Sequence, residues 1–191
     1  PGNLGGDART FAAWIKAPDE GNFGDSTAQK WRYITAWGTN VPWDGGRWMI
    51  ALNYGWVFVA SNAFAKVETR VADGTWHHIA VTLPQNGVIT DVKIYIDGIL
   101  STSTVFGGNL TTQVNTHDPN YDGIYNDVYV GGYAEAATTD FFLGDIDDVR
   151  IYSDVQTGAQ IREFSGVPEP ATVALLGLGG LALLRRKKNK K

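Results

Sequence analysis

Short apolar segments separated by polar, glycine-rich turns recur along most of this chain, and this pattern restricts the fold more than any other feature. Apolar and polar residues alternate within the segments, as they do in strands with one buried face. Asp73-Gly74 and Asp97-Gly98 are typical of tight turns, and Tyr54-Gly55 suits a tight hairpin between its neighbours. The predicted strands are residues 9–17, 31–38, 47–53, 56–60, 65–72, 76–83, 91–97, 100–105, 127–131 and 141–152.

Helix is almost absent from the pattern, since only residues 157–164 suit one, of two turns at most. Many short strands with so little helix predict an all-β protein, an antiparallel β-sandwich or jelly roll. The length of 191 residues suits one such domain with little left over. Periodicity alone does not choose between the sandwich topologies.

Composition and charge exclude several classes of protein. The chain has no cysteine, which excludes disulfides, thiolate metal sites and a cysteine nucleophile. Six of its 16 basic residues lie in the last seven positions, so residues 1–184 carry ten basic against 20 acidic side chains. A body with this excess of negative charge repels phosphate backbones and attracts cations, which argues against nucleic acid as a partner.

Four motifs recur in an order and spacing that resemble a known family. They are residues 10–16 (TFAAWIK), 74–82 (GTWHHIAVT), 92–98 (VKIYIDG) and 144–152 (GDIDDVRIY). Together they resemble the laminin-G-like, concanavalin A-like lectin domains. The resemblance implies a concanavalin A-like jelly roll over residues 1–164, with a lectin-like role in binding carbohydrate or polysaccharide.

The motifs are stronger indicators of fold than of chemistry. We expect Trp76, Ile79 and Val81 to fill the core between the sheets. The family usually has one or two strands before the segment that contains Trp14. The sequence begins at Pro1 without a methionine, so we expect a fragment or processed chain that lacks those strands and exposes apolar edges.

A second resemblance lies at the C-terminus. Pro168-Glu169-Pro170 precedes an apolar run, residues 171–184, and then the basic residues Arg185, Arg186, Lys187 and Lys188. This order resembles the PEP-CTERM sorting signal of Gram-negative bacteria. It implies export, cleavage near the Pro-Glu-Pro motif by an exosortase, and a final place at the cell surface or in an extracellular polysaccharide matrix.

The same segment suggests how the chain meets the membrane. We expect residues 165–170 to be a linker, residues 171–184 an inner-membrane anchor helix, and residues 185–191 a basic cytoplasmic tail that leaves the β domain outside. Fourteen residues span about 21 Å as a helix, short of the roughly 30 Å bilayer core. An interfacial or buried helix is therefore the alternative.

One loop has the composition of a calcium site. Oxygen-bearing side chains stand at positions 1, 3, 5 and 9 of a segment with glycine at position 6, namely Asp118, Asn120, Asp122 and Asn126. Hard cations such as Ca²⁺ need several oxygen ligands on a sharply turning chain, so we expect Ca²⁺ as a candidate cofactor. Tyr129 stands where an EF-hand has a bidentate glutamate, and an ordinary polar loop is the alternative.

The sequence favours a domain without catalytic activity. Asp145 and Asp147 share one face of a predicted strand, where two carboxylates could serve as acid and base under a cleft. The family pattern implies a structural role for this cluster instead, and no Gly-x-Ser-x-Gly motif occurs. His77 and His78 are adjacent, so they point to opposite faces of a strand and do not easily bind one metal ion.

The tryptophans are the remaining functional signal. Five of the seven fall within 26 residues, namely Trp31, Trp37, Trp43, Trp48 and Trp56. Sugars stack on exposed rings, and Trp43, beside Pro42 and Asp44, is the expected ligand contact, whereas the other four lie in strand patterns typical of a core. A carbohydrate-binding module is the first hypothesis. A structural or adhesion domain without sugar specificity, or a fragment of a glycoside hydrolase or lyase, are the alternatives.

Overall fold

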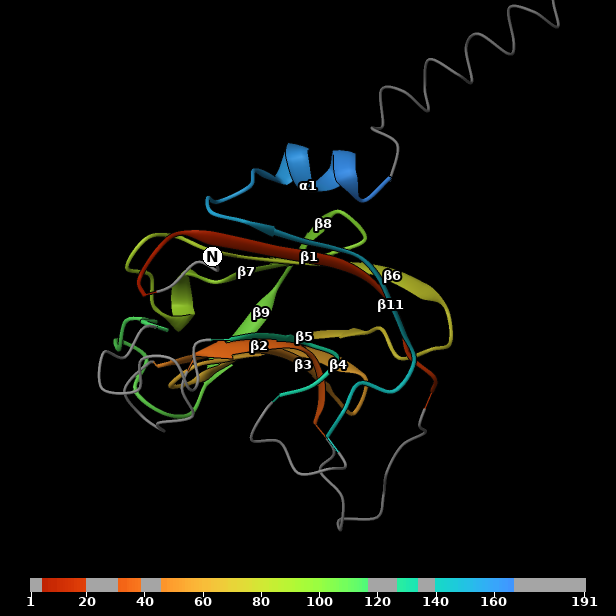
Figure 1. The fold of residues 1–191 in the computed structure, drawn as a ribbon, viewed down its shortest axis with the longest axis horizontal. Coiled ribbons are helices and arrows are strands. Elements are labelled where there is room, and N and C mark those ends of the chain that lie inside the picture. Colours follow the sequence, from red (N-terminus) through yellow and green to blue (C-terminus); the bar gives the residue numbers. More distant parts are fainter. Residues whose placement is uncertain (1–4, 20–30, 39–45, 117–126, 134–139, 167–191) are drawn as a thin grey trace, which may run out of the picture.

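The protein is a sandwich of two antiparallel β-sheets, as the sequence predicted (Figure 1). The computed structural model describes residues 5–19, 31–38, 46–116, 127–133 and 140–166. The five-stranded sheet has the order β11 (Asp145–Tyr152), β1 (Arg9–Lys16), β6 (Trp76–Leu83), β7 (Lys93–Ile96) and β8 (Ile99–Ser101). The six-stranded sheet has the order β10 (Val128–Val130), β2 (Arg32–Gly38), β3 (Arg47–Asn53), β4 (Trp56–Ala60), β5 (Phe64–Arg70) and β9 (Ser103–Phe106).

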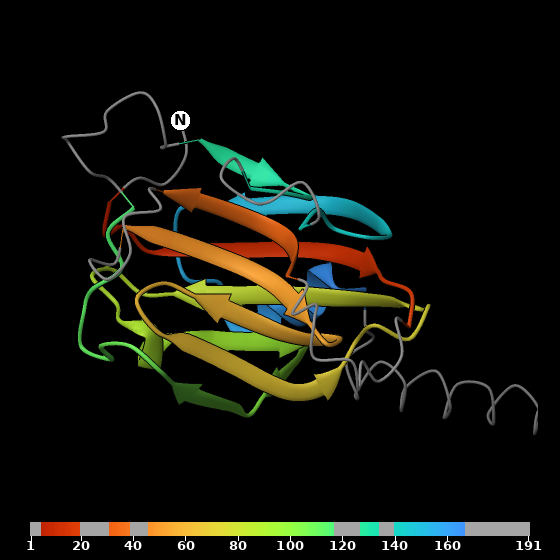
Figure 2. The same ribbon diagram turned by 90° about the horizontal axis from the view of Figure 1, so that it is seen from below.

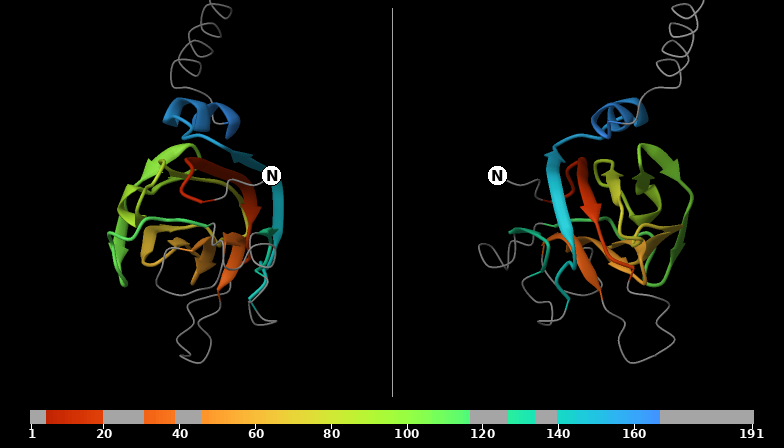
Figure 3. Two further views of the ribbon diagram at one scale, coloured as in Figure 1. Left: turned by 60° about the vertical axis from the view of Figure 1, so that its left-hand side comes forward. Right: turned by 90° about the vertical axis from the view of Figure 1, so that its right-hand side faces the viewer.

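Two short helices complete the described part of the chain, the 3₁₀ turn η1 (Ile89–Asp91) and α1 (Gly158–Phe164). Figure 3 shows α1 on the outer face of the five-stranded sheet, on the side away from the six-stranded sheet. Among the described residues, neither helix has the length and apolar character needed to cross a bilayer. The predicted anchor, residues 171–184, lies outside the described residues.

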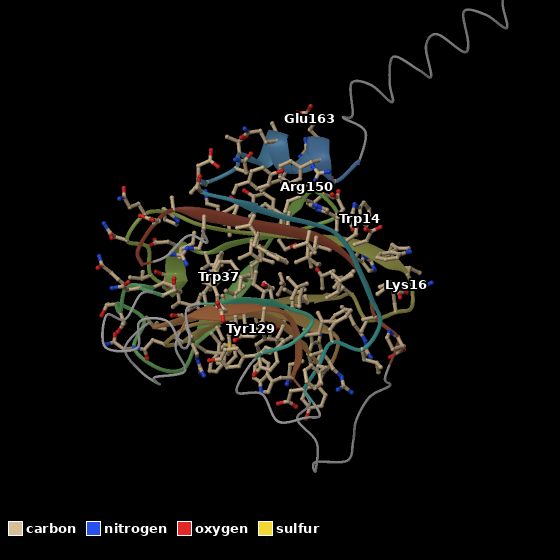
Figure 4. All side chains as sticks on the ribbon, viewed as in Figure 1. Trp14, Lys16, Trp37, Tyr129, Arg150 and Glu163 are labelled. Carbon is tan, nitrogen blue, oxygen red and sulfur yellow. The ribbon has the colours of Figure 1, made fainter. Side chains whose placement is uncertain are left out.

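The core lies between the two sheets and is built from alternate residues of each strand. On β1 these are Phe11, Ala13 and Ile15, all fully buried. From the six-stranded sheet, Trp37 and Trp48 meet edge to face with their ring centres 4.6 Å apart, and Trp37 lies between the sheets in Figure 4. Such a pair adds about 1 kcal/mol to the free energy gained from burial.

A buried cation lies against this tryptophan pair. Arg9 is fully buried, with its guanidinium carbon 5.8 Å from the ring centre of Trp37 and 5.3 Å from that of Trp48. It donates hydrogen bonds to Thr116 Oγ1 and the carbonyl of Asp7, both at 3.0 Å. Burial lowers the pKa of Arg9 to about 10, opposed by the nearby charge of Asp7, so the side chain stays charged at neutral pH.

Tight turns set the register of two hairpins. Tyr54 and Gly55 both have positive φ, 52° and 82°, and join β3 to β4. Asp97 and Gly98, at 52° and 75°, join β7 to β8 in the same way. Two positive φ values in a two-residue loop match the twist of the flanking strands. These were the turns predicted from the dipeptides.

Two sequence predictions need correction. The predicted strand 100–105 is two strands, because the chain leaves the five-stranded sheet after β8 and enters the six-stranded sheet as β9. Trp76 was expected in the core but is 43 % exposed, whereas Ile79 and Val81 are fully buried. Trp76 pairs with Lys16 at the start of β6, so alternation puts it on the outer face together with His78.

The edge strands β10 and β11 leave apolar side chains partly exposed. Val130 on β10 is 49 % exposed, and Val149 and Ile151 on β11 are 39 % and 41 % exposed. Ile151 pairs with the core residue Phe11 of β1, so its side chain points toward the space between the sheets.

Candidate functional site

The outer face of the six-stranded sheet carries an open groove rich in aromatic side chains. Figure 2 views the sandwich from the side of this sheet, which α1 does not cover. The groove has a volume of about 580 Å³. Its lining, called here the aromatic groove, consists of Trp31, Asn53, Tyr54, Trp56, Phe58, Phe64, Lys66, Glu68, Thr104 and Phe106.

Strand alternation explains why these side chains share one face. On β4, Val57 and Val59 enter the core, so Trp56 and Phe58 point outward. On β5, Ala65 and Val67 likewise enter the core. The alternate residues Phe64, Lys66 and Glu68 therefore point outward and line the groove. Strand β9 then adds Phe106 opposite Phe64 and Thr104 opposite Lys66.

Four rings of the aromatic groove hold one another in place. Phe64 stacks on Trp31 with ring centres 5.9 Å apart and on Phe106 with centres 5.6 Å apart. Phe58 stands nearly perpendicular to Trp31 and Phe106, at 5.3 Å and 6.2 Å. Mutual packing restricts their rotamers, so little side-chain entropy remains to be lost when a ligand binds.

The polar side chains of the groove are close to neutral as a group. The Lys66 ammonium lies 4.0 Å from the ring centre of Trp56 and 3.1 Å from Glu68 Oε1. Asn53 and Thr104 add an amide and a hydroxyl to the lining. Stacking surfaces beside a few hydrogen-bonding groups suit a ligand that is apolar on one face and polar at its edges.

All the site residues predicted from the sequence lie outside the described residues. They are the calcium-loop residues Asp118, Asn120, Asp122 and Asn126, the ligand contact Trp43, the sorting motif Pro168, Glu169 and Pro170, and the basic residues Arg185, Arg186, Lys187 and Lys188. They remain predictions. Within the part of the chain that the structure describes, no group of three His, Cys, Asp or Glu side chains could hold a metal ion.

The second acidic cluster serves the strand itself. Asp148 has a positive φ of 47° where the pairing of β11 with β1 shifts register. Its amide donates to Asp147 Oδ1 at 2.7 Å, and its carboxylate accepts two hydrogen bonds from Arg150, at 2.9 and 2.7 Å. These contacts hold the bulge, which matches the structural role that the family resemblance implied.

The two histidines have different surroundings. His78 is 2 % exposed and packs against Trp14 and Phe164, with ring centres 5.5 and 5.8 Å away. His77 instead forms hydrogen bonds with Asp97 through Nδ1, at 2.8 Å, and with Asp73 through Nε2, at 3.2 Å. The rings therefore do not converge on one metal ion, as adjacency on a strand predicted.

These surroundings move the pKa values in opposite directions. Burial lowers the pKa of His78 to about 4. Burial also acts to lower the pKa of His77, but hydrogen bonds to Asp97 and Asp73 outweigh it and raise that pKa above its ordinary value. Hydrogen bonds from the Thr75 side chain and backbone lower the pKa of Asp73 to about 2.

The sequence did not identify the aromatic groove. Trp31 and Trp56 were assigned to the core with Trp37 and Trp48, and only the latter two are fully buried there. One signal was available. Residues 56–60 (WVFVA) are apolar at every position, so both faces of that strand are apolar and the outer one needs a cover or a ligand.

The described part of the chain is thus a two-sheet antiparallel β-sandwich with a helix on one outer face and an aromatic groove on the other. The Laminin_G_3 family model of the concanavalin A-like lectin/glucanases superfamily matches residues 1–162, and the chain belongs to this superfamily. The PEP-CTERM protein-sorting motif matches residues 166–188. Both resemblances predicted from the sequence are confirmed.

Comparison with solved structures supports the fold. The CBM40 domain of the Ruminococcus gnavus IT-sialidase, bound to α2,3 sialyllactose, matches with a TM-score of 0.58 and 13 % identity over 86 % of this chain and 85 % of its own. A protein from Bacteroides ovatus, described as a candidate carbohydrate binding protein, matches with a TM-score of 0.57 and 20 % identity over 85 % of this chain and 42 % of its own.

A sialidase from Trypanosoma rangeli matches with a TM-score of 0.54 and 12 % identity, over 84 % of this chain and 23 % of its own. This chain spans about two fifths of the length of several matched structures, the Bacteroides ovatus protein among them. A search of curated proteins finds no match. At these identities the likeness concerns the fold alone.

Proposed function

We propose that the protein is an exported, non-catalytic carbohydrate-binding module and that the aromatic groove is its binding site. The observation that carries this proposal is the groove of about 580 Å³ on an outer sheet face, a volume suited to a small ligand. The apolar faces of sugar rings would lie on Trp56 and Phe106, and the hydroxyl groups would meet Asn53, Thr104 and Lys66.

The carboxylates of the groove support binding rather than hydrolysis. Within the described residues, Glu68 is the one acidic side chain in the lining, and it lies 3.1 Å from the Lys66 ammonium. Glycoside hydrolysis normally needs a pair of carboxylates, about 5 to 10 Å apart across the scissile bond. A lone, ion-paired glutamate is poorly suited to that chemistry.

The sorting motif supports a place outside the cell. The β domain would be exported and held at the inner membrane by residues 171–184, and an exosortase would then cleave near Pro168-Glu169-Pro170. The basic residues from Arg185 onward would stay on the cytoplasmic side. The released domain would bind polysaccharide at the cell surface or in the extracellular matrix of a Gram-negative bacterium.

A calcium ion is a further part of this proposal. Asp118, Asn120, Asp122 and Asn126 would supply oxygen ligands, as their spacing predicts. The net charge of −4 favours cation binding in general. Binding measured with and without Ca²⁺ tests this part independently of the aromatic groove.

A glycan array followed by calorimetry tests the proposed function. We expect Trp56→Ala to weaken binding of the selected glycan about tenfold, equivalent to 1.4 kcal/mol, because it removes a stacking surface. Trp76→Ala removes an equally large, 43 % exposed ring from the opposite sheet, so it should leave the affinity unchanged. Absence of glycan binding with and without Ca²⁺ would favour a structural or adhesion domain instead.

A further inference from the structure

The aromatic groove presents a carboxylate to an incoming ligand. Of the described side chains that line it, two carry a formal charge, Lys66 and Glu68, and the ammonium lies 3.1 Å from the carboxylate. The two partners are unequally exposed to solvent, since the side chain of Glu68 is 66 % exposed and that of Lys66 only 19 %. The carboxylate is therefore the charge that a ligand in the groove meets first.

The Lys66 ammonium already has partners inside the groove. It lies 4.0 Å from the ring centre of Trp56 and 6.0 Å from that of Phe58, in addition to its ion pair with Glu68. The electron-rich faces of aromatic rings attract a cation, and more strongly where water is excluded. These partners balance much of the charge of Lys66, so it has little attraction left for an anionic ligand.

A second ion pair beside the groove is arranged in the same way. Arg70 on β5 stands opposite Trp56 on β4 and forms an ion pair with Asp19. Here too the carboxylate is the more exposed partner, since the side chain of Asp19 is 60 % exposed and that of Arg70 31 %. Both pairs thus turn their negative ends to solvent next to the stacking surface of Trp56, and exposed negative charges repel an anionic ligand.

The net charge of the domain acts in the same direction but over a different range. Residues 1–184 carry ten basic against 20 acidic side chains, and the basic residues that offset this excess follow the Pro-Glu-Pro motif. At physiological salt, exposed charges are largely screened beyond about 8 Å. The net charge therefore affects mainly the approach of a polymer, and discrimination between bound glycans depends on charges within the groove.

We propose that Glu68 makes the aromatic groove selective for uncharged glycans over glycans that carry carboxylate or sulfate groups. This inference rests on the proposed glycan binding by the groove and adds the class of glycan. The hydroxyl groups of a neutral sugar can donate hydrogen bonds to the Glu68 carboxylate. An ionised carboxylate or sulfate has no proton to donate and adds like-charge repulsion, so Glu68 favours the first class and rejects the second.

A glycan array that contains matched neutral and anionic glycans tests this selectivity in the full chain. Lactose and α2,3 sialyllactose form one such pair, and galactose-terminated glycans with and without sulfate form others. Calorimetry then compares the best-bound glycan with its partner of the other charge class. Glu68→Gln removes the charge and keeps the size of the side chain. Glu163→Gln is the matched control, because it makes the same change in net charge on α1, on the outer side of the other sheet (Figure 4).

We expect the wild type to bind the neutral member of a pair about tenfold more tightly than the anionic member. Glu68→Gln should remove most of this difference by strengthening binding of the anionic glycan. It should change binding of the neutral glycan little, because the amide oxygen of the new side chain still accepts hydrogen bonds. Glu163→Gln should leave both affinities as they are in the wild type.

The other outcomes separate this inference from the proposed function. Equal binding of both members by the wild type, or tighter binding of the anionic one, would overturn the selectivity and leave glycan binding by the protein intact. Equal changes in Glu68→Gln and Glu163→Gln would assign the selectivity to net charge and overturn the role of Glu68. If the array shows no bound glycan of either class, the proposed function and this inference fail together.

Discussion

His78 is a titratable side chain held in an apolar layer between the five-stranded sheet and α1. Its Nδ1 atom is buried without a hydrogen-bond partner in the described chain, and Trp14 and Phe164 pack on its ring. The charged groups that face it are Asp97, Arg150 and Asp148. Burial outweighs their attraction and repulsion, so the neutral imidazole is the form compatible with the fold.

Because burial favours neutral His78, the free energy of unfolding should decrease as the pH is lowered. The pKa of His78 falls from 6.5 to about 4 on folding, so its contribution to stability is complete above pH 6.5 and is lost as the pH falls toward 4. We expect the free energy of unfolding to drop by about 2 kcal/mol between pH 7 and pH 5 from this residue alone. Urea denaturation at the two pH values measures the drop.

The matched comparison is with His78→Gln, in which titration of the carboxylates is retained. His77 contributes with the opposite sign, because its raised pKa adds stability at low pH that is lost as the pH rises through that value. The difference between wild type and variant isolates His78 from both effects. Equal drops in the two proteins would show that His78 is not held neutral by the fold.

At the scale of elements, α1 is a short helix that depends on its caps and its docking. Thr157 accepts a hydrogen bond from the Gln160 amide, and Gln160 Oε1 accepts one from the Thr157 amide at 2.8 Å, which forms a capping box. Seven residues form too short a helix to be stable alone. Burial of Ile161 and the packing of Phe164 against Tyr152, with ring centres 5.4 Å apart, supply the rest.

Because α1 provides much of the burial of His78, loosening the helix should change the titration of that residue. We expect Phe164→Ala to raise the pKa of His78 from about 4 toward 6.5 and to cost about 3 kcal/mol of stability. NMR titration of the ring protons measures the first effect and urea denaturation the second.

Phe141→Ala is the control for this change. Phe141 is a 53 % exposed aromatic whose backbone pairs with Tyr33 of the other sheet, away from α1. The Phe141→Ala substitution should leave the pKa of His78 unchanged from the wild type. If the pKa of His78 is also unchanged in Phe164→Ala, the sheet excludes water from His78 without the help of the helix.

At the scale of the whole molecule, the two outer faces have separate roles. One face is covered by α1 and leads to the sorting motif, and the other carries the aromatic groove (Figures 1 and 2). Figure 4 shows Arg150 beneath α1 and Tyr129 on the six-stranded sheet, with the core between them. Neither face contributes to the packing of the other, so binding and sorting are expected to be independent.

A chain that ends at Gly166 tests this independence. It keeps all described contacts of α1, including the hydrogen bond from Ser165 N to the Ile161 carbonyl. We expect its melting temperature to lie within about 2 °C of the full chain, and its affinity for any glycan bound by the groove to be unchanged. A chain that ends at Thr157 is the comparison, since it lacks α1 and should be clearly less stable.

The sequence by itself determined the strands, their turns and the family. Period-two alternation and the Tyr54-Gly55 and Asp97-Gly98 turns depend on neighbouring residues, so local analysis could find β3, β4 and β6 with their bounds. The two C-terminal features, the Pro-Glu-Pro motif and the basic end, are likewise readable as a linear pattern.

Only the tertiary structure decided which face of each strand is covered. Alternation shows that Trp56 and Phe58 share a face, but whether that face is core or groove depends on where the second sheet and α1 pack. The aromatic groove joins Trp31, Phe64 and Phe106, which are far apart in sequence and adjacent only through strand register. A single strand does not show which of its faces the rest of the protein covers, and for that reason Trp31 and Trp56 were assigned to the core and Trp76 with them.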